Sequence, residues 1–192
     1  MDFAILILGL ILFLGTHSVA IFAPALREAR MKSIGEGPWR GLYSISSAIG
    51  LVLIVWGYAR AQPTAPVLYV PPFWLTHVTI LLMALAFISL AVSSLPPGRL
   101  KPALKHPMLV SVKVWAFAHL LVNGDLASLI LFLSFLAWAV LDRISLKRRQ
   151  APVPEAGPVR NDVIAIVVGL VIWLLFIWKL HAWLIGVPVP IA

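Results

Sequence analysis

The chain has 192 residues, of which 61% are hydrophobic and 11% are charged, with a formal net charge of +8 and a mean hydropathy of +1.01. An average soluble domain is roughly 45–50% apolar, so this chain lacks the polar side chains needed to cover a water-exposed surface. The composition excludes an ordinary soluble protein and predicts an all-α integral membrane protein. The absence of cysteine excludes disulfides and thiolate ligands, and leaves histidine as the only strong side-chain ligand for a soft metal.

Apolar runs predict a polytopic bundle of six transmembrane helices within one domain that covers residues 1–192. About 20 apolar residues cross a bilayer, because an α-helix rises about 1.5 Å per residue. The first run follows no basic residue, so we expect it to be a helix of the mature protein rather than a signal peptide. The predicted helices cover residues 3–23, 41–58, 73–95, 107–122, 126–141 and 163–186.

The connections follow from turn residues and charges. A basic loop is predicted between the first two helices, and residues 142–161 form the most polar stretch, predicted to be a surface loop. Asn123-Gly124-Asp125 predicts a tight turn, so the fourth and fifth helices should form an antiparallel hairpin. Both are short for a hydrocarbon layer of about 30 Å. In the second helix, Gly41, Gly50 and Gly57 predict close helix packing.

Basic residues predict the orientation. With six spans both termini lie on one side, and the loops opposite the termini hold nearly all of the lysines and arginines. The positive-inside rule makes that side cytoplasmic, so both termini should be extracytoplasmic in a bacterial cytoplasmic membrane. The charge therefore indicates topology and contact with anionic lipid, and it does not indicate nucleic acid. The residues on the basic side are Arg27, Arg30, Lys32, Arg40, Arg99, Lys101, Lys105, Arg143, Lys147, Arg148, Arg149 and Arg160, and the opposite loops hold Arg60.

Histidines are the candidate ligands. His17 and His119 are the two placed deepest in the predicted spans, and two neutral imidazoles on different helices suit bis-histidine ligation of haem b. Thr16 and Ser18 are expected to orient His17, and the four-residue spacing places Trp115 and Asn123 on the His119 face.

Other roles and other pairs stay open. A lone intramembrane histidine is more often a hydrogen-bonded packing residue than a ligand. His77 and His181 lie near tryptophans at the outer boundary, and His106 precedes Pro107 at a helix entry. By depth alone, His17 with His106, or His119 with His77 or His181, are alternative pairs. The predicted spans contain no carboxylate, so the sequence identifies no catalytic residue.

Several motifs resemble the NnrU family of bacterial multi-pass membrane proteins, which is associated with nitrite and nitric oxide reduction in denitrification. The resemblance covers nearly the whole chain. It implies a membrane protein in redox or nitrogen-oxide metabolism. The alternative is an accessory factor that binds a membrane reductase. The expected protein partners are such a reductase or further copies of this chain in a homo-oligomer. The motifs are residues 35–44 (GEGPWRGLYS), 55–58 (VWGY), 106–109 (HPML), 113–125 (KVWAFAHLLVNGD) and 138–143 (WAVLDR).

The chain is also similar to zeta-carotene isomerase, a membrane enzyme with histidine-ligated haem b. That resemblance matches one ligand to His17, which Ser18 follows, and the other to His119, four residues after Trp115. The isomerase has a cysteine, proposed as an alternative ligand, where this chain has Ala116. The departure puts a ligand-swap mechanism in doubt and leaves haem binding as the expectation.

Overall fold

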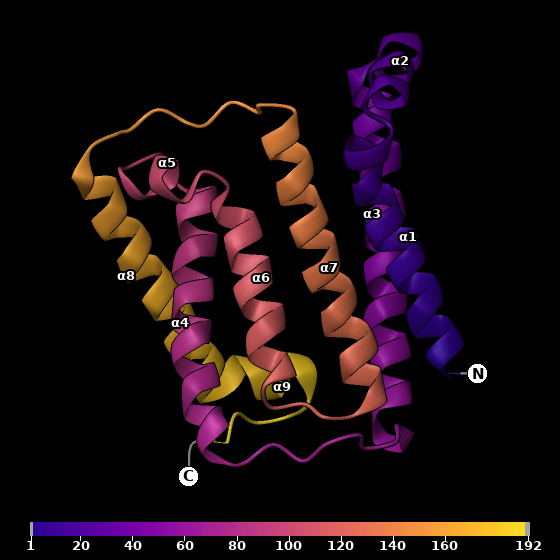
Figure 1. Ribbon diagram of the computed structural model, residues 1–192, viewed down its shortest axis with the longest axis vertical. Helices are drawn as coiled ribbons and strands as arrows, with labels where there is room; N and C mark the ends of the chain where they lie inside the picture. Colours follow the sequence, from indigo (N-terminus) through magenta and orange to yellow (C-terminus); the bar gives the residue numbers. More distant parts are fainter. Residues whose placement is uncertain (1, 191–192) are drawn as a thin grey trace. The chain divides into compact units, whose positions relative to one another are not determined.

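The computed structural model describes residues 2–190, and Figure 1 shows the order of the helices. The all-α prediction is confirmed. A 3₁₀ turn at Gln62–Thr64 and a π-helical segment at Phe176–Leu180 accompany the α-helices. These are α1 (Asp2–Phe22), α2 (Pro24–Ile34), α3 (Glu36–Ala61), α4 (Trp74–Ser94), α5 (Leu100–Leu104), α6 (Pro107–Leu120), α7 (Leu126–Arg148), α8 (Val159–Leu175) and α9 (His181–Ile185).

Within residues 2–190, five helical stretches are long and apolar enough to cross a membrane. They confirm a multi-pass membrane protein, and lipid is the expected cover for their exposed apolar side chains. Helix α6 is apolar but shorter, so a sixth span and the orientation of the termini stay predictions. The five stretches are Asp2–Phe22, Glu36–Thr64, Trp74–Ser94, Leu126–Arg148 and Val159–Ile185.

The structure corrects the boundaries predicted around α2, α3 and α7. Helix α3 begins at Glu36 and ends at Ala61, whereas the sequence predicts a helix over residues 41–58. The expected basic loop after α1 is largely helix α2, because Pro24 suits a first helical turn and the residues after it are strong helix formers. Gly35, with φ of 89°, separates α2 from α3 in a backbone conformation that favours glycine. Helix α7 continues beyond residue 141 to Arg148, because lysine and arginine are good helix formers and favour a helix C-terminus. The polar loop is correspondingly shorter.

The described chain divides into two compact units. The first unit combines the stretch up to Val70 with Asn123–Arg149, and the second combines Pro71–Val122 with the stretch from Gln150 onward. Helix α7 packs on α1 and α3 in the first unit, whereas α6 packs on α4 in the second. The two helices that the turn signal predicts to pair as a hairpin therefore have different packing partners.

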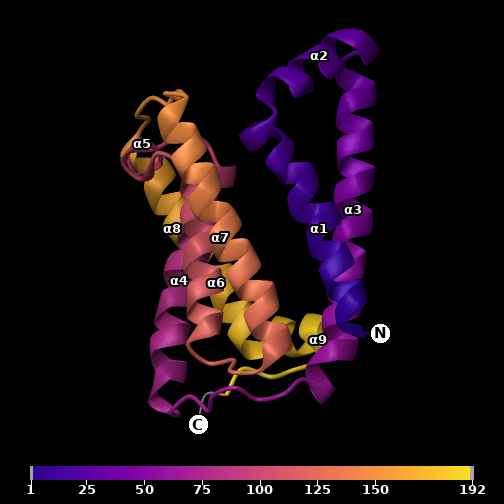
Figure 2. The ribbon, with the colours of Figure 1, turned by 45° about the vertical axis from the view of Figure 1, so that its right-hand side comes forward.

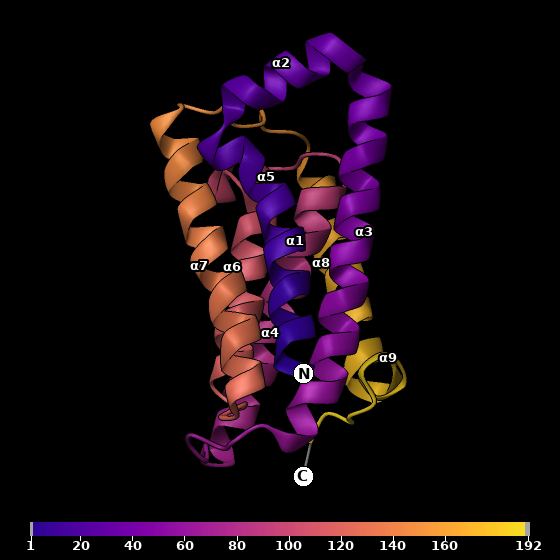
Figure 3. The same cartoon turned by 90° about the vertical axis from the view of Figure 1, so that its right-hand side faces the viewer.

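In the first unit, α1 and α3 run antiparallel, joined by α2 (Figures 2 and 3). Glycines hold them close: a Cβ at Gly50 would lie 2.7 Å from the Phe13 backbone nitrogen, and one at Gly57 would meet the Leu6 backbone. The predicted small-residue packing is thus confirmed at both positions, whereas Gly41 has no such neighbour within 4 Å. An ion pair of 2.8 Å between Arg60 and Asp2 joins the two helices at one end.

The second unit is built on α4, which lies between α6 and α8 (Figure 1). The Thr79 hydroxyl of α4 donates to the Ala118 carbonyl of α6 at 3.0 Å. The Trp173 indole of α8 donates to the Ile80 carbonyl of α4, also at 3.0 Å. These bonds satisfy polar side chains inside an apolar bundle, where an unpaired polar group is costly.

A carboxylate of α8 binds the connection between α4 and α5 in this unit. Asp162, on the first turn of α8 and 8% exposed, accepts hydrogen bonds from the backbone N–H groups of Arg99 and Leu100 at 2.8 and 3.0 Å. Gly98 lies so close to that carboxylate that a Cβ would overlap it. The Asn161 amide donates to the Pro97 carbonyl at 2.8 Å. The α4–α5 connection is therefore held by α8 rather than by its own turns.

The Asn123-Gly124-Asp125 segment is more than a turn. The Gly124 carbonyl accepts the Leu68 N–H at 2.8 Å, and the Asn123 carbonyl accepts the Tyr69 hydroxyl at 3.0 Å. Burial, and secondarily the Asp125 carboxylate, raise the pKa of Tyr69, so the phenol remains a donor at neutral pH. Together these bonds fix the entry to α7 on the 65–70 loop.

Asp125 also caps α7, which gives a testable consequence. Its carboxylate accepts the Ser128 N–H at 2.9 Å and the Ser128 hydroxyl at 2.6 Å. We expect Asp125→Ala to lower the free energy of unfolding by about 1–2 kcal/mol, since it removes an N-cap. Thermal unfolding in detergent measures the loss. Asp125→Asn retains a capping oxygen and should cost much less, and an equal loss in both variants would contradict the capping role.

Candidate functional site

His17 lies in an aromatic cluster built from three helices of the first unit. Its ring stacks on Phe13 of α1 with centroids 4.3 Å apart. The rings of Tyr43 from α3 and Trp138 from α7 make edge-to-face contacts with it, with centroids 5.1 and 5.9 Å away. Close α1–α3 packing at Gly50, two helical turns along α3 from Tyr43, brings Tyr43 near the histidine. The imidazole is thus partly buried among flat apolar rings.

The protonation of the His17 ring follows from its hydrogen bond. Nδ1 lies 2.7 Å from the Phe13 carbonyl oxygen, and because a carbonyl only accepts, Nδ1 carries the proton. The neutral ring then has its lone pair on Nε2. Metal-ligating histidines commonly donate the other ring N–H to such an acceptor, which fixes the tautomer and the ring orientation. The Thr16 hydroxyl, expected to orient the ring, pairs with Ser46 at 2.7 Å.

Two polar atoms of this unit are buried without a hydrogen-bond partner within residues 2–190: the Trp138 indole nitrogen and the Ser47 hydroxyl. Trp138 belongs to the His17 cluster, and Ser47 follows Tyr43 by one helical turn on α3. A buried donor without a partner costs about 1–3 kcal/mol, so such atoms are rare in folded proteins unless a ligand or water satisfies them. The Trp138 indole N–H is therefore an unpaired donor within the aromatic cluster around His17.

His119 repeats the local geometry of His17 in the second unit. On α6, its Nδ1 lies 2.9 Å from the Trp115 carbonyl oxygen, so Nδ1 donates and the neutral ring has its lone pair on Nε2. The Trp115 ring lies beside it at 5.5 Å. The spacing prediction holds for Trp115, whereas Asn123 lies beyond Leu120, where α6 ends, and is therefore not on the His119 helical face.

The other three histidines occupy boundaries. His106 is the N-cap residue of α6, as the following proline predicts. His77 is exposed near the start of α4, with the Phe73 ring 5.5 Å away. The His181 Nδ1 donates to the Val187 carbonyl at 2.6 Å, next to the chain end of the second unit. These positions leave two histidines within the apolar helices: His17 lies inside α1, and His119 lies in the last turn of α6.

Sequence reasoning missed the partners of His17. Phe13 has a detectable signal, since it precedes His17 by four residues and so shares its helical face. Tyr43 and Trp138 come from distant parts of the chain, and no local spacing connects them to His17. Both lie within motifs that carry the family resemblance, residues 35–44 and 138–143.

The donor set suits a cofactor that supplies most of its own ligands. Within residues 2–190 there is no cluster of three histidine or acidic side chains able to hold a metal ion. A structural or catalytic metal ion usually needs three or four protein ligands, whereas haem iron needs one or two axial ligands, for which neutral imidazole is common. Isolated, oriented histidines beside aromatic rings therefore fit haem.

Comparison with known proteins identifies the family of the chain. The family model described as NnrU protein matches residues 5–189. No curated protein and no solved structure matches the chain.

Proposed function

Because the chain belongs to the NnrU family, we propose that this multi-pass membrane protein binds haem b through His17 and His119 and serves nitrite and nitric oxide metabolism. The observation that carries the proposal is the shared orientation of the two imidazoles. In each, Nδ1–H donates to the carbonyl oxygen four residues earlier, which leaves Nε2 as the lone-pair nitrogen. We place it in a bacterial cytoplasmic membrane, following the basic loops.

The two histidines would hold the haem iron, each through its Nε2 nitrogen. Phe13, Tyr43 and Trp138 surround the His17 ring and would exclude water from it. The Trp115 ring lies beside the His119 ring. The buried indole N–H of Trp138 is a donor for a polar group of the bound ligand. Haem bound in this way would supply one-electron redox chemistry at the iron.

The test is an absorption spectrum of the protein purified in mild detergent from haem-replete cells, before and after dithionite. We expect a Soret band that shifts on reduction, with His17→Ala and His119→Ala each losing most of the bound haem. His77→Ala is the matched control, because His77 is exposed and at a helix start. No Soret band, or an unchanged band in both ligand variants, would overturn the proposal.

The accessory-factor alternative makes a different prediction. If the histidines are structural, both alanine variants still support nitric oxide reduction in cells. Gly50 and Gly57 pack against α1 and are therefore not open to a partner protein, whereas Gly41 has nothing within 4 Å. A carotenoid-isomerase-like activity is the third candidate, and conversion of a polyene by purified haem-loaded protein would favour it.

A further inference from the structure

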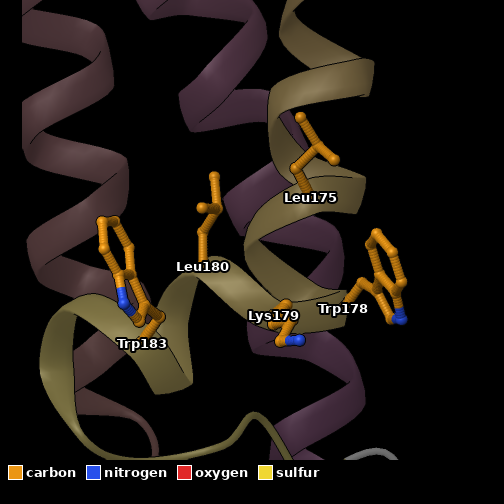
Figure 4. Close-up of a pocket in the computed structure, with 5 residues that line it drawn as sticks. All are labelled: Leu175, Trp178, Lys179, Leu180 and Trp183. Atoms are coloured by element: carbon orange, nitrogen blue, oxygen red, sulfur yellow. The ribbon is translucent and has the colours of Figure 1, made fainter.

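The last membrane-span candidate bends at a π-helical segment. The His181 N–H donates to the Phe176 carbonyl, five residues earlier, so Phe176–Leu180 holds one extra residue per turn. Helix α9 then leaves the direction of α8 (Figures 1 and 4). Such π-segments occur mostly as single turns and frequently at functional sites, and they are a defined cause of helix kinks. The chain beyond the bend is fixed by Gly186, with φ of 84°, which ends α9.

A cavity of about 300 Å³ lies along this bend and is lined by Leu175, Trp178, Lys179, Leu180 and Trp183. Figure 4 shows Leu180 and Trp183 projecting on one side of the bend, and Trp178 projecting away on the other. The two indoles are 78% and 75% exposed, the most exposed tryptophans described. The surface of the cavity is almost wholly apolar, and Lys179 is the one charged residue among those that line it.

Lys179 makes no ion pair with a carboxylate within residues 2–190, where the recorded pairs involve Arg40 and Arg60. Its charge is therefore available to an external anion. The bend lies near the end of Val159–Ile185, a stretch long and apolar enough to cross a membrane. Tryptophan and lysine at such an end meet the phospholipid headgroup layer, where a phosphate and the upper acyl chain lie side by side. The occupant with complementary charge and shape is a phospholipid.

We propose that the α8–α9 bend binds one anionic phospholipid. The Lys179 ammonium pairs with the headgroup phosphate, the acyl chain lies along Leu175 and Leu180, and Trp178 and Trp183 flank the glycerol region. A net-negative lipid is favoured over a zwitterionic one, because the latter carries its own cation beside the phosphate. The proposal is independent of haem, since it involves none of the histidine ligands.

Native mass spectrometry of the delipidated full-length protein, titrated with phosphatidylglycerol or phosphatidylcholine, tests this. We expect one phosphatidylglycerol to bind preferentially, and Lys179→Gln to weaken its binding about fivefold, the effect of one basic residue near an anionic lipid surface. Lys179→Arg should retain binding. Lys147→Gln, at an exposed position of α7 among the basic-side residues, is the matched control. Any lipid contact that it loses lies elsewhere, so the roughly fivefold effect of Lys179→Gln should be the same in its background.

A second measurement separates lipid contact from any folding defect. Brominated phosphatidylglycerol should quench tryptophan fluorescence, and Trp178→Phe with Trp183→Phe should remove more of that quenching than Trp56→Phe, an exposed tryptophan of α3. Equal affinity for both lipids, unchanged binding in Lys179→Gln, or a dimer that covers Trp178 and Trp183 and excludes lipid would each overturn the proposal.

Discussion

Gly57→Val is expected to separate α1 from α3 and to lower the free energy of unfolding by about 3 kcal/mol, at the upper end of the usual cost of overpacking. A side chain at Gly57 would meet the backbone of Leu6 and Ile5, and backbone cannot move aside as a flexible side chain can. Leu6 is itself fully buried, so the helices must shift apart and lose packing on both faces. Thermal unfolding in detergent measures the effect.

Gly41→Val is the matched control for that experiment. It makes the same residue change in the same helix, at a position with nothing within 4 Å, so only the small propensity difference remains. A similar loss of stability in both variants would show that valine in α3, rather than close packing, is responsible. Gly57→Val should also bind less haem than Gly41→Val, because the close packing of α1 with α3, which includes Gly50, positions Tyr43 beside His17.

Asp162→Ala is expected to lower the free energy of unfolding by about 3 kcal/mol. The carboxylate accepts two backbone hydrogen bonds in a buried setting, and each bond to a charged group contributes about 1.5–3 kcal/mol, offset in part by the cost of burying the charge. Its loss leaves the Arg99 and Leu100 N–H groups without their acceptor. The α4–α5 connection should therefore become the first part of the second unit to open, which amide hydrogen exchange detects.

Two further variants bracket this effect. Asp162→Asn keeps one acceptor oxygen but places an amide N–H₂ against a second donor, so an intermediate loss is expected. Glu155→Ala removes an exposed carboxylate of the preceding loop and should change stability by less than about 0.5 kcal/mol. Equal stability of Asp162→Ala and Glu155→Ala would show that the hydrogen bonds of Asp162 to the α4–α5 connection do not stabilise the unit.

The long apolar helices were predictable because membrane spans depend on local composition, and their ends fall within a few residues of prediction except at α3 and α7. Helix α2 is not predictable from charge alone, because its basic residues suggest a loop although arginine and lysine are strong helix formers. Similarly, α7 continues past Leu141, where the sequence predicts its end, to Arg148. Charge indicates where a chain meets water, and it does not by itself end a helix.

The site was predictable only in part. Burial and helical spacing identify His17, His119 and Trp115 from the sequence. The spacing fails at Asn123, because the apolar Leu121 and Val122 give no signal that α6 ends at Leu120. The rings of Tyr43 and Trp138 reach His17 through tertiary packing, which requires the glycine contacts of α1 with α3 and the placement of α7. No local pattern contains that information.

The interleaved chain path has a consequence for biogenesis. Each unit is made of two separate stretches of the chain. Residues 71–122, which belong to the second unit, are therefore synthesised before Asn123–Arg149, which complete the first unit. During translation, α1 and α3 lack their contacts with α7, including that of His17 with Trp138, until α7 is synthesised. Helices α4 and α6 likewise lack the contacts of α4 with α8 until α8 is synthesised. Cutting the gene between Val122 and Asn123 would leave no whole unit in either fragment, and only joint expression would restore both.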